Sequence, residues 1–454
     1  MNFLTRAIGL SAPIALLALP FALTIGPAVS EPCIGTLIAA LIHASVVRHD
    51  WSWLWRPWFL FAALWCGWLI ICSLPGIAAA ETFPLWTLQA VLTMRLPLCA
   101  AAIAWLLGQR GGLSRALHAA VVLVALYIVV QLGWQFVTGA NFFGEPMRDN
   151  GLLTGPFNRP RAGPIMMLLF FPVLLPPVAW LVARGAFGRF MGAGLLAAGF
   201  AVLLPIGQRM PILLVGLGLV VAVLMLPALR RAAIVAVFVG SVVLAAGAIL
   251  FPQAQHRLTV HFAGLMGDFP SSHHGLIFSR ALAMADAHPW HGRGFAAFRT
   301  GCAEERYFVV LLDSQPKDGG GADICVTHAH NLYLEALTDA GWPGLLLFSG
   351  FAIASLLTLV RPAYARHTGL SRYPRLQPGE EKHVDTRIRG HDDGGIAATR
   401  DPIAIALFIA AFLYLWPIAA GNPFTNAYTG GWFILLLGWG LAPKENPRLS
   451  PGVP

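Results

Sequence analysis

The chain carries little charge: of its 454 residues only 11% are Asp, Glu, Lys or Arg, against about 25% in an ordinary soluble domain. Hydrophobic residues make up 57%, so a water-soluble fold of this size would lack the polar groups needed to cover its surface. These values exclude a cytosolic globular protein and a disordered chain. Six cysteines are too few for a disulfide scaffold. The composition instead predicts an all-α integral membrane protein.

Several catalytic motifs are also missing. The sequence has no Walker loop for ATP, no H-E-x-x-H, no C-x-x-C and no G-x-S-x-G nucleophile elbow. It has no Asp-x-Asp pair of the kind that holds a divalent metal ion in many glycosyl-transferring enzymes. We therefore expect neither a metal site of that type nor a cofactor.

Twelve apolar segments are long enough, or nearly so, to cross a hydrocarbon core of about 30 Å as helices. Two of them are short, and Pro211 makes 190–227 either two short helices or a broken pair. The segments are 8–29, 33–47, 58–77, 84–107, 116–137, 162–183, 190–206, 211–227, 232–251, 332–360, 401–420 and 431–442.

The connections between these segments alternate in charge. The neutral or acidic set comprises 78–83, 138–161, 207–210, 252–331 and 421–430. The basic set comprises Arg48 and Arg56, Arg110 and Arg115, Arg184 and Arg189, Arg230 and Arg231, the loop 361–400, and the tail with Lys444 and Arg448. The positive-inside rule places the basic set and both termini in the cytoplasm. The net charge of +9 is therefore an orientation signal, and no nucleic-acid partner is expected.

The longest outer connection divides the chain. Residues 252–331 are too polar for the membrane and long enough to form a small helical subdomain between helices 1–9 in 1–251 and helices 10–12 in 332–454. Cys302 and Cys325 both lie in this loop, where an oxidising periplasm would favour a disulfide that stabilises the fold by roughly 3 kcal/mol. The alternative is two unrelated thiols.

Three arginines lie at the outer ends of predicted helices. Arg161 follows Asn158 just before the sixth helix, where it either binds an anion or snorkels to lipid headgroups. Arg209 lies between two apolar helices with almost no loop, a costly place for a charge without a function. Arg280 could reach inward from a helix of the outer loop. Arg95 lies well inside a predicted helix and has no obvious acidic partner on it.

Histidines form the second polar group. His291 and Arg293 lie in a Gly-rich turn and could equally be solvated. His328 and His330 open the tenth helix, where the helix dipole favours a neutral imidazole that can act as a base. Two histidines at i, i+2 could also bind a metal ion, but no third ligand has suitable spacing.

The order of these segments resembles the O-antigen ligase family and its wider group of polymerases and O-oligosaccharyltransferases. The resemblance covers mainly 150–350 and is strongest at "HAHNLYLEALTDAGWPG", with His330, Asn331, Glu335 and Gly341; "HPWHGRGFAAF" matches more loosely. Gln208 stands where the family typically has Ser before the arginine, which leaves only the role of that neighbour in doubt.

The resemblance implies a GT-C-like fold in a bacterial inner membrane and a metal-independent glycosyl transfer in the periplasm. Undecaprenyl diphosphate-linked O-antigen would be the donor and a sugar hydroxyl of lipid A-core the acceptor. Arginines suit the diphosphate leaving group, for which Arg161, Arg209 and Arg280 are candidates, and His330 is the candidate base. One-step attack would invert the anomeric carbon. Possible substrate contacts are Asn158, His328, Asn331, Glu335, His291 and Arg293.

Other functions remain open from the sequence. An O-antigen polymerase could use the same donor, base and arginines. A protein-directed oligosaccharyltransferase is less well supported, because no further large C-terminal periplasmic region follows. A transporter or flippase would also fit twelve helices, but we find no convincing internal repeat, and the polar residues gather at one membrane face rather than at the midplane.

Overall fold

The computed structural model describes residues 3–77, 84–110, 112–148, 151–250, 268–310, 315–364, 401–419, 424–425 and 428–443. Within these ranges the protein is helical, and the described residues contain no strand beyond an isolated bridge between Ala140 and Pro146. The protein is thus an all-α membrane protein.

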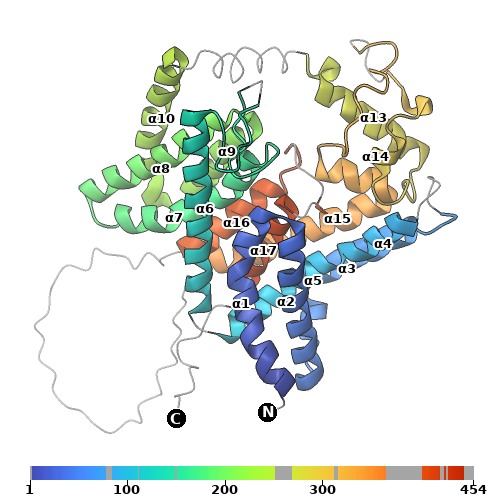
Figure 1. Cartoon of the computed structure of the whole chain (residues 1–454), viewed down its shortest axis with the longest axis horizontal. Helices are drawn as coiled ribbons and strands as arrows, with labels where there is room; N and C mark the ends of the chain where they lie inside the picture. The colour runs from blue at the N-terminus through green and yellow to red at the C-terminus, as the bar shows by residue number, and fades with distance from the viewer. Residues whose placement is uncertain are drawn as a thin grey trace, which may run out of the picture.

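Long helices follow one another along the chain (Figure 1). They are α1 (Phe3–Ile25), α2 (Pro27–Arg48), α3 (Pro57–Cys72), α4 (Pro84–Thr93), α5 (Arg95–Gln109), α6 (Leu113–Thr138), α7 (Ala162–Val182), α8 (Ala186–Ile206), α9 (Arg209–Met225), α10 (Arg230–Leu250), α13 (His273–Ala287), α14 (Ala297–Gly301), α15 (Leu332–Tyr364), α16 (Pro402–Tyr414) and α17 (Thr429–Leu441).

Seven helices in the described part of the chain are long and apolar enough to cross a membrane. An eighth span is possible if α9 and α10, which meet at a bend of 117°, are counted together. Three shorter apolar helices, α3, α16 and α17, occupy further predicted segments. Every predicted segment is therefore largely helical, but the number of twelve spans is not confirmed, and neither is the GT-C relationship.

The first turn between helices lies earlier than the hydropathy predicts. The chain breaks at Gly26, whose φ of 146° suits glycine, and α2 starts at Pro27, a residue favoured at the first helical position. The predicted boundary near residue 33 is therefore wrong by about two turns. The shift places Glu31 inside α2 rather than in a loop.

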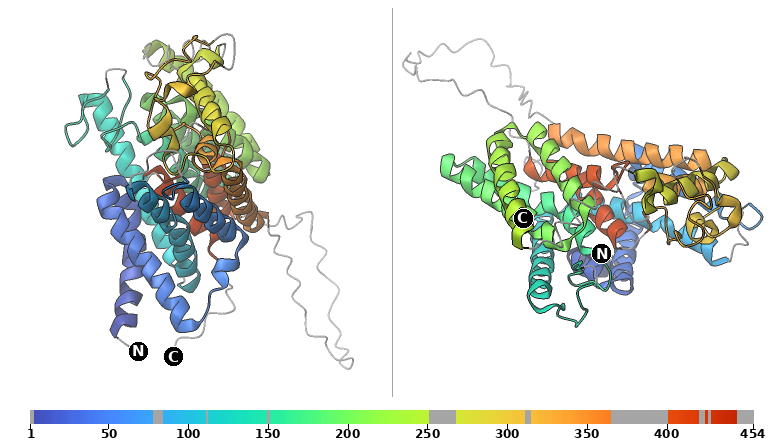
Figure 2. Two further views of the ribbon diagram at one scale, coloured as in Figure 1. Left: turned by 90° about the vertical axis from the view of Figure 1, so that its right-hand side faces the viewer. Right: turned by 90° about the horizontal axis from the view of Figure 1, so that it is seen from above.

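The centre of the bundle is formed by α16 and α17, whose side chains are mostly buried. Tyr414 of α16 stacks on Phe433 of α17 with ring centroids 4.4 Å apart. α16 packs on α7 and α17 packs on α5, while α15 packs along α3 at the edge of the bundle (Figure 2). The short central helices are thus shielded by longer ones.

Residues 268–310 and 315–331 fold around a small core of their own beside the N-terminal end of α15 (Figure 1). Ile277, Met284 and Phe298 are buried there. Cys302 and Cys325 form the disulfide that their position favours, with Cα atoms 5.7 Å apart. Residues 252–267 of the predicted subdomain and 365–400 of the predicted cytoplasmic loop lie outside the described residues.

Candidate active site

A cavity of about 680 Å³ lies between this subdomain and the membrane helices α3, α4, α5 and α15. Its lining combines cationic, acidic and aromatic side chains: Arg95, Arg159, Arg161, Arg299, Glu335, Asp339, His328, Trp65, Trp86, Phe295, Phe348 and Phe424. Such a mixture can hold an anionic group and a sugar side by side, because guanidinium groups pair with phosphate and carboxylates accept hydroxyl hydrogen bonds.

Arg161 is held in the cavity wall by an aromatic ring. It caps the N-terminal end of α7, and its guanidinium carbon lies 3.6 Å from the centre of the Tyr428 ring. This stacking fixes the plane of the guanidinium and leaves its edge available for hydrogen bonds. Arg161 also lines a neighbouring cavity of about 210 Å³, which the exposed Asn158 enters.

Gln208 ties the start of α9 to the turn that carries Arg161. Its Nε2 donates to the carbonyl of Pro160 at 2.7 Å. Gly163 makes this approach possible, because a Cβ at that position would lie 1.9 Å from Gln208 Oε1. Gln208 therefore connects the turn that carries Arg161 to Arg209, the first residue of α9.

Imidazoles gather where α13 meets the segment before α15. The rings of His328 and His330 are 4.3 Å apart, and His274 contacts His330 edge-on at 5.2 Å. His330 adopts a φ of 54°, a conformation that non-glycine residues rarely adopt. Sequence reasoning overlooked His274, whose only signal was the pair of histidines at 273–274.

The histidines of this cluster favour their neutral forms. Burial lowers the pKa of His330 to about 3, and the charges of His328, His274 and His273 act in the same direction. Burial and the charge of Arg299 lower the pKa of His328 to about 4. Desolvation lowers the pKa of His274, and so do the charges of His273 and Arg209. The effect of Arg209 on His274 shows that the structure brings this predicted arginine to the histidine cluster.

Two carboxylates one helical turn apart on α15 complete the cavity wall. Glu335 Oε2 accepts from the backbone N–H of Ala329 at 2.8 Å. Asp339 Oδ1 accepts from the backbone N–H of Ala297 at 2.9 Å. Glu335 thus holds the chain beside His330, and Asp339 holds the turn before α14. Asp339 was not among the predicted site residues, although an acid within a long apolar run is a signal for one.

The helix α15 is interrupted at Gly341, and the loop before α14 supplies backbone hydrogen bonds that the interrupted helix lacks. Gly341 interrupts the helix with φ 66° and ψ −168°. Trp342 N–H donates to Pro289 O at 2.8 Å, while Thr338 O and Asp339 O accept from the N–H groups of Arg293 and Gly294, both at 2.9 Å. The subdomain is thereby joined to a membrane helix through the backbone.

Comparison with known proteins agrees with this arrangement. Residues 193–349 match the O-antigen ligase family. This match spans about a third of the chain and supports the O-antigen ligase family. The matched region begins within α8 and ends within α15, so it contains Arg209, the histidine cluster and both carboxylates, whereas Arg161 lies before it. A search of curated proteins finds no significant match. The match therefore supports a membrane enzyme of the O-antigen ligase and polymerase group.

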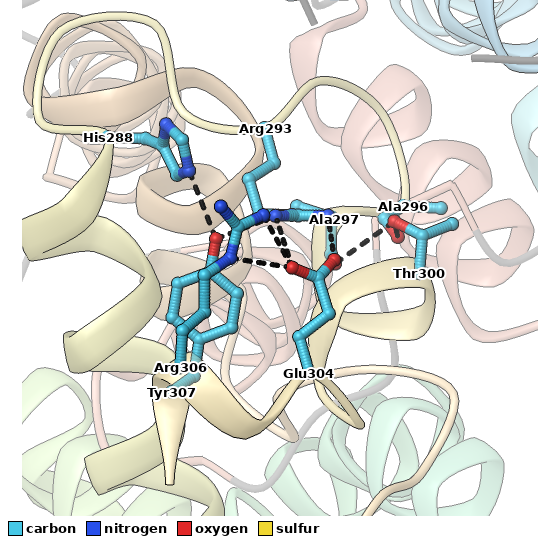
Figure 3. Close-up of polar contacts among 8 residues, drawn as sticks. All are labelled: His288, Arg293, Ala296, Ala297, Thr300, Glu304, Arg306 and Tyr307. Carbon is cyan, nitrogen blue, oxygen red and sulfur yellow. Dashed lines mark hydrogen bonds and ion pairs between the residues drawn. The ribbon is translucent and has the colours of Figure 1, made fainter. Parts of the chain in front are cut away.

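Three predicted arginines of the region that matches the O-antigen ligase family do not line the cavity: Arg209, Arg280 and Arg293. Arg280 is buried among the carbonyls of Cys302, Gly319 and Gly321, to which its guanidinium donates. Arg293 is buried as well: it pairs with Glu304 and donates to the Tyr307 hydroxyl at 2.6 Å (Figure 3). Both guanidinium groups hold the subdomain together, so neither is placed to bind a donor.

The remaining predicted residues of the O-antigen ligase domain differ in position. Asn331 caps α15: its Oδ1 accepts from Tyr333 N–H and Leu334 N–H, and its Nδ2 donates to Pro417 O at 2.6 Å. These bonds occupy the amide, which indicates a positioning role. His291 is half-buried, and its Nδ1 lies 2.8 Å from Gly292 O, away from the cavity lining.

Arg95 has the acidic partner that its own helix lacks. Its Nε donates to both carboxylate oxygens of Glu31 on α2, at 2.9 and 3.0 Å. Among the described residues, no three His, Cys, Asp or Glu side chains are arranged to share a metal ion.

Proposed function

We propose that this protein is an O-antigen ligase. It transfers the glycan of an undecaprenyl diphosphate-linked O-antigen to a sugar hydroxyl of lipid A-core oligosaccharide. The observation that supports this most directly is the cluster of His274, His328 and His330, which lies within the region that matches the family and beside a cavity lined by arginines. We place this site on the periplasmic side, because the basic connections lie at the opposite ends of the helices.

The donor supplies a diphosphate leaving group. As the bond between the anomeric carbon and the phosphate oxygen breaks, that oxygen takes the electron pair and negative charge grows on the diphosphate. Arg161 and Arg209 are retained as its binding residues, and Arg299 takes the place of Arg280 because it is exposed in the cavity next to His328. Permanent charge and two parallel N–H donors suit guanidinium groups to this task.

The acceptor hydroxyl must lose its proton as its oxygen attacks the anomeric carbon. His330 takes this proton in our proposal, since its neutral form persists at any physiological pH. His328 is the second candidate, because it lines the cavity and its buried Nε2 has no hydrogen-bond partner among the described residues. One displacement by the acceptor inverts the anomeric configuration, and no metal ion is needed.

The two carboxylates fit acceptor recognition better than nucleophilic attack. Each is already fixed by a backbone N–H, and each lies beside aromatic side chains, Trp65, Trp86 and Phe295, that offer flat apolar faces to a sugar ring. We assign Glu335 and Asp339 to hydrogen bonds with acceptor hydroxyls.

A reconstituted reaction tests the proposal. The full-length protein in liposomes is incubated with a lipid-linked O-antigen and lipid A-core, and the products are separated by electrophoresis. We expect the core to gain mass, and His330→Ala to abolish this while the protein level stays unchanged. Longer lipid-linked glycans with an unmodified core would show a polymerase instead. If neither product forms, a transporter becomes the better explanation.

The histidine variants separate the two candidate bases. We expect His330→Ala to lower kcat by at least a hundredfold, the range of general-base catalysis, and His328→Ala to raise mainly KM. The reverse order would assign the base to His328.

We expect glycan transfer to continue in the presence of a chelator. Loss of activity in the chelator, followed by recovery with a divalent ion, would contradict the metal-independent mechanism.

A further inference from the structure

Another cavity, of about 180 Å³, lies between the N-terminal half of α1 and the C-terminal parts of α2 and α5. It shares no lining residue with the candidate active site. Its lining comes from α1, α2, the end of α5 and the residue that follows α5: Ile8, Gly9, Ala12, Ala40, His43, Ala44, Val47, Arg48, Trp105, Leu106, Gln109 and Arg110.

The walls and the rim of this cavity differ in chemistry. Small and aliphatic side chains such as Ala12, Ala40 and Leu106 form the walls, whereas the exposed Arg48 and Arg110 lie at the rim. Arg48 Nη1 donates to Gln109 Oε1 at 2.8 Å, and Arg110 Nη2 donates to Gly9 O at 2.6 Å. These bonds hold each guanidinium in place and leave most of its five N–H donors unused.

The two positive charges are not neutralised by the described residues around them. Neither Arg48 nor Arg110 forms an ion pair within that part of the chain. The Asp50 carboxylate accepts its hydrogen bond from the backbone N–H of Ser52, which lowers the pKa of Asp50, and the charge of Arg48 helps to lower it further. The two fixed guanidinium groups over an apolar recess are therefore able to bind an anion.

Exposed aromatic and apolar side chains next to the cavity are typical of a lipid headgroup region. Trp51 and Trp55, which follow α2 on this face, are exposed, as expected for aromatic residues at a membrane interface. Leu10 and Val47, next to the cavity, are 69% and 58% exposed, which leaves an apolar surface for acyl chains. A free phosphate ion would gain nothing from the apolar walls.

We propose that this cavity binds the phosphate headgroup of an anionic phospholipid from the surrounding leaflet. Arg48 and Arg110 pair with the phosphate, and the start of an acyl chain fills the recess between α1, α2 and α5. Basic pockets between membrane helices are known to favour such headgroups. The site does not depend on the proposed glycan transfer.

Lipid titration of the full-length protein in detergent tests this proposal. Cardiolipin or phosphatidylglycerol is added, and thermal unfolding and lipid adducts in native mass spectra are recorded. We expect stabilisation and retained adducts with these anionic lipids and not with phosphatidylcholine. Glycerol phosphate, which has the charge without the chains, should have no effect. Equal effects of phosphatidylcholine or of glycerol phosphate would overturn the proposal.

Variants locate the site. We expect Arg48→Gln with Arg110→Gln to weaken binding of anionic lipid at least tenfold, and Arg56→Gln, on the same face but outside the cavity, to leave it unchanged. Ala44→Leu keeps both charges and fills the recess, so it should weaken binding as well and serves if the double variant fails to fold. Unchanged binding by both cavity variants would refute the assignment.

Discussion

At the scale of single residues, the site depends on imidazoles that remain uncharged. Folding desolvates His328 and His330 and lowers their pKa to about 4 and about 3, so a proton can be accepted only once negative charge is nearby. The diphosphate of a bound donor would supply that charge. A weak base in the free enzyme thus becomes a stronger one when the substrate is in place.

The pH dependence should reveal this coupling. A histidine with an ordinary pKa near 6.5 would be roughly 97% protonated at pH 5, whereas these histidines stay neutral there. We expect kcat/KM, which reports the free enzyme, to keep most of its value between pH 7 and 5, and kcat to fall at higher pH than kcat/KM does. A tenfold decrease of kcat/KM per unit below pH 6.5 would contradict this picture.

The same shifts affect stability. Above about pH 6.5 both the folded and the unfolded chains carry neutral histidines, so stability does not change there. Below it the unfolded chain binds protons first, and the free energy of unfolding should decrease as the pH falls toward 4. Thermal unfolding of His330→Asn should show a smaller decrease, because one buried imidazole has been removed.

The stacking of Arg161 on Tyr428 leads to another prediction at the residue scale. Arg161→Lys keeps the positive charge but loses the planar donor pair, so we expect glycan transfer to fall at least tenfold, or about 1.4 kcal/mol of transition-state binding. Tyr428→Phe retains the ring under the guanidinium and should keep most of the activity. Full activity in Arg161→Lys would indicate an interfacial arginine without a donor contact.

At the scale of elements, the break in α15 joins the subdomain to the membrane. A Cβ at Gly341 would lie 2.5 Å from Pro289 O, and φ there is 66°. We expect Gly341→Ala to destabilise the protein by about 1–3 kcal/mol and to expose residues 288–297 to protease. Gly67→Ala on α3, where nothing lies within 4 Å of the added atom, is the matched control and should do neither.

Hydropathy predicts where helices lie but not which polar residues meet. The apolar segments predict every long membrane helix, since a run of about 20 apolar residues has few alternatives in lipid. The predicted segments 8–29 and 33–47 leave Glu31 between them, whereas α2 begins at Pro27, so they do not predict its pairing with Arg95. The sequence could not predict that Arg280 is buried, because the three backbone carbonyls that accept its hydrogen bonds come from distant positions in the chain.

At the scale of the whole molecule, the active-site cavity and the lipid cavity mark different ends of the helices. The sequence predicts this division from the charge of the connections, although it could not predict either cavity, since each is lined by segments that only the packing brings together. Arg161 and His328, for instance, are more than 160 residues apart in the sequence, and both line the active-site cavity.

The disulfide tests the orientation of the entire chain. If the subdomain faces the oxidising periplasm, Cys302 and Cys325 should resist alkylation in intact cells until a reductant is added. Their double serine variant should show no such change, and a strain without periplasmic thiol oxidase should yield reactive thiols. Free thiols at these two positions in wild-type cells would place the subdomain on the cytoplasmic side.

The ion pair between Glu31 and Arg95 bears on how the chain enters the membrane. The two residues are 64 positions apart and belong to different helices, α2 and α5. During synthesis Glu31 emerges first, and an unpaired acid is costly inside lipid. We therefore expect the N-terminal end of α2 to stay near water until α5 is in place, which would order the insertion of the first helices.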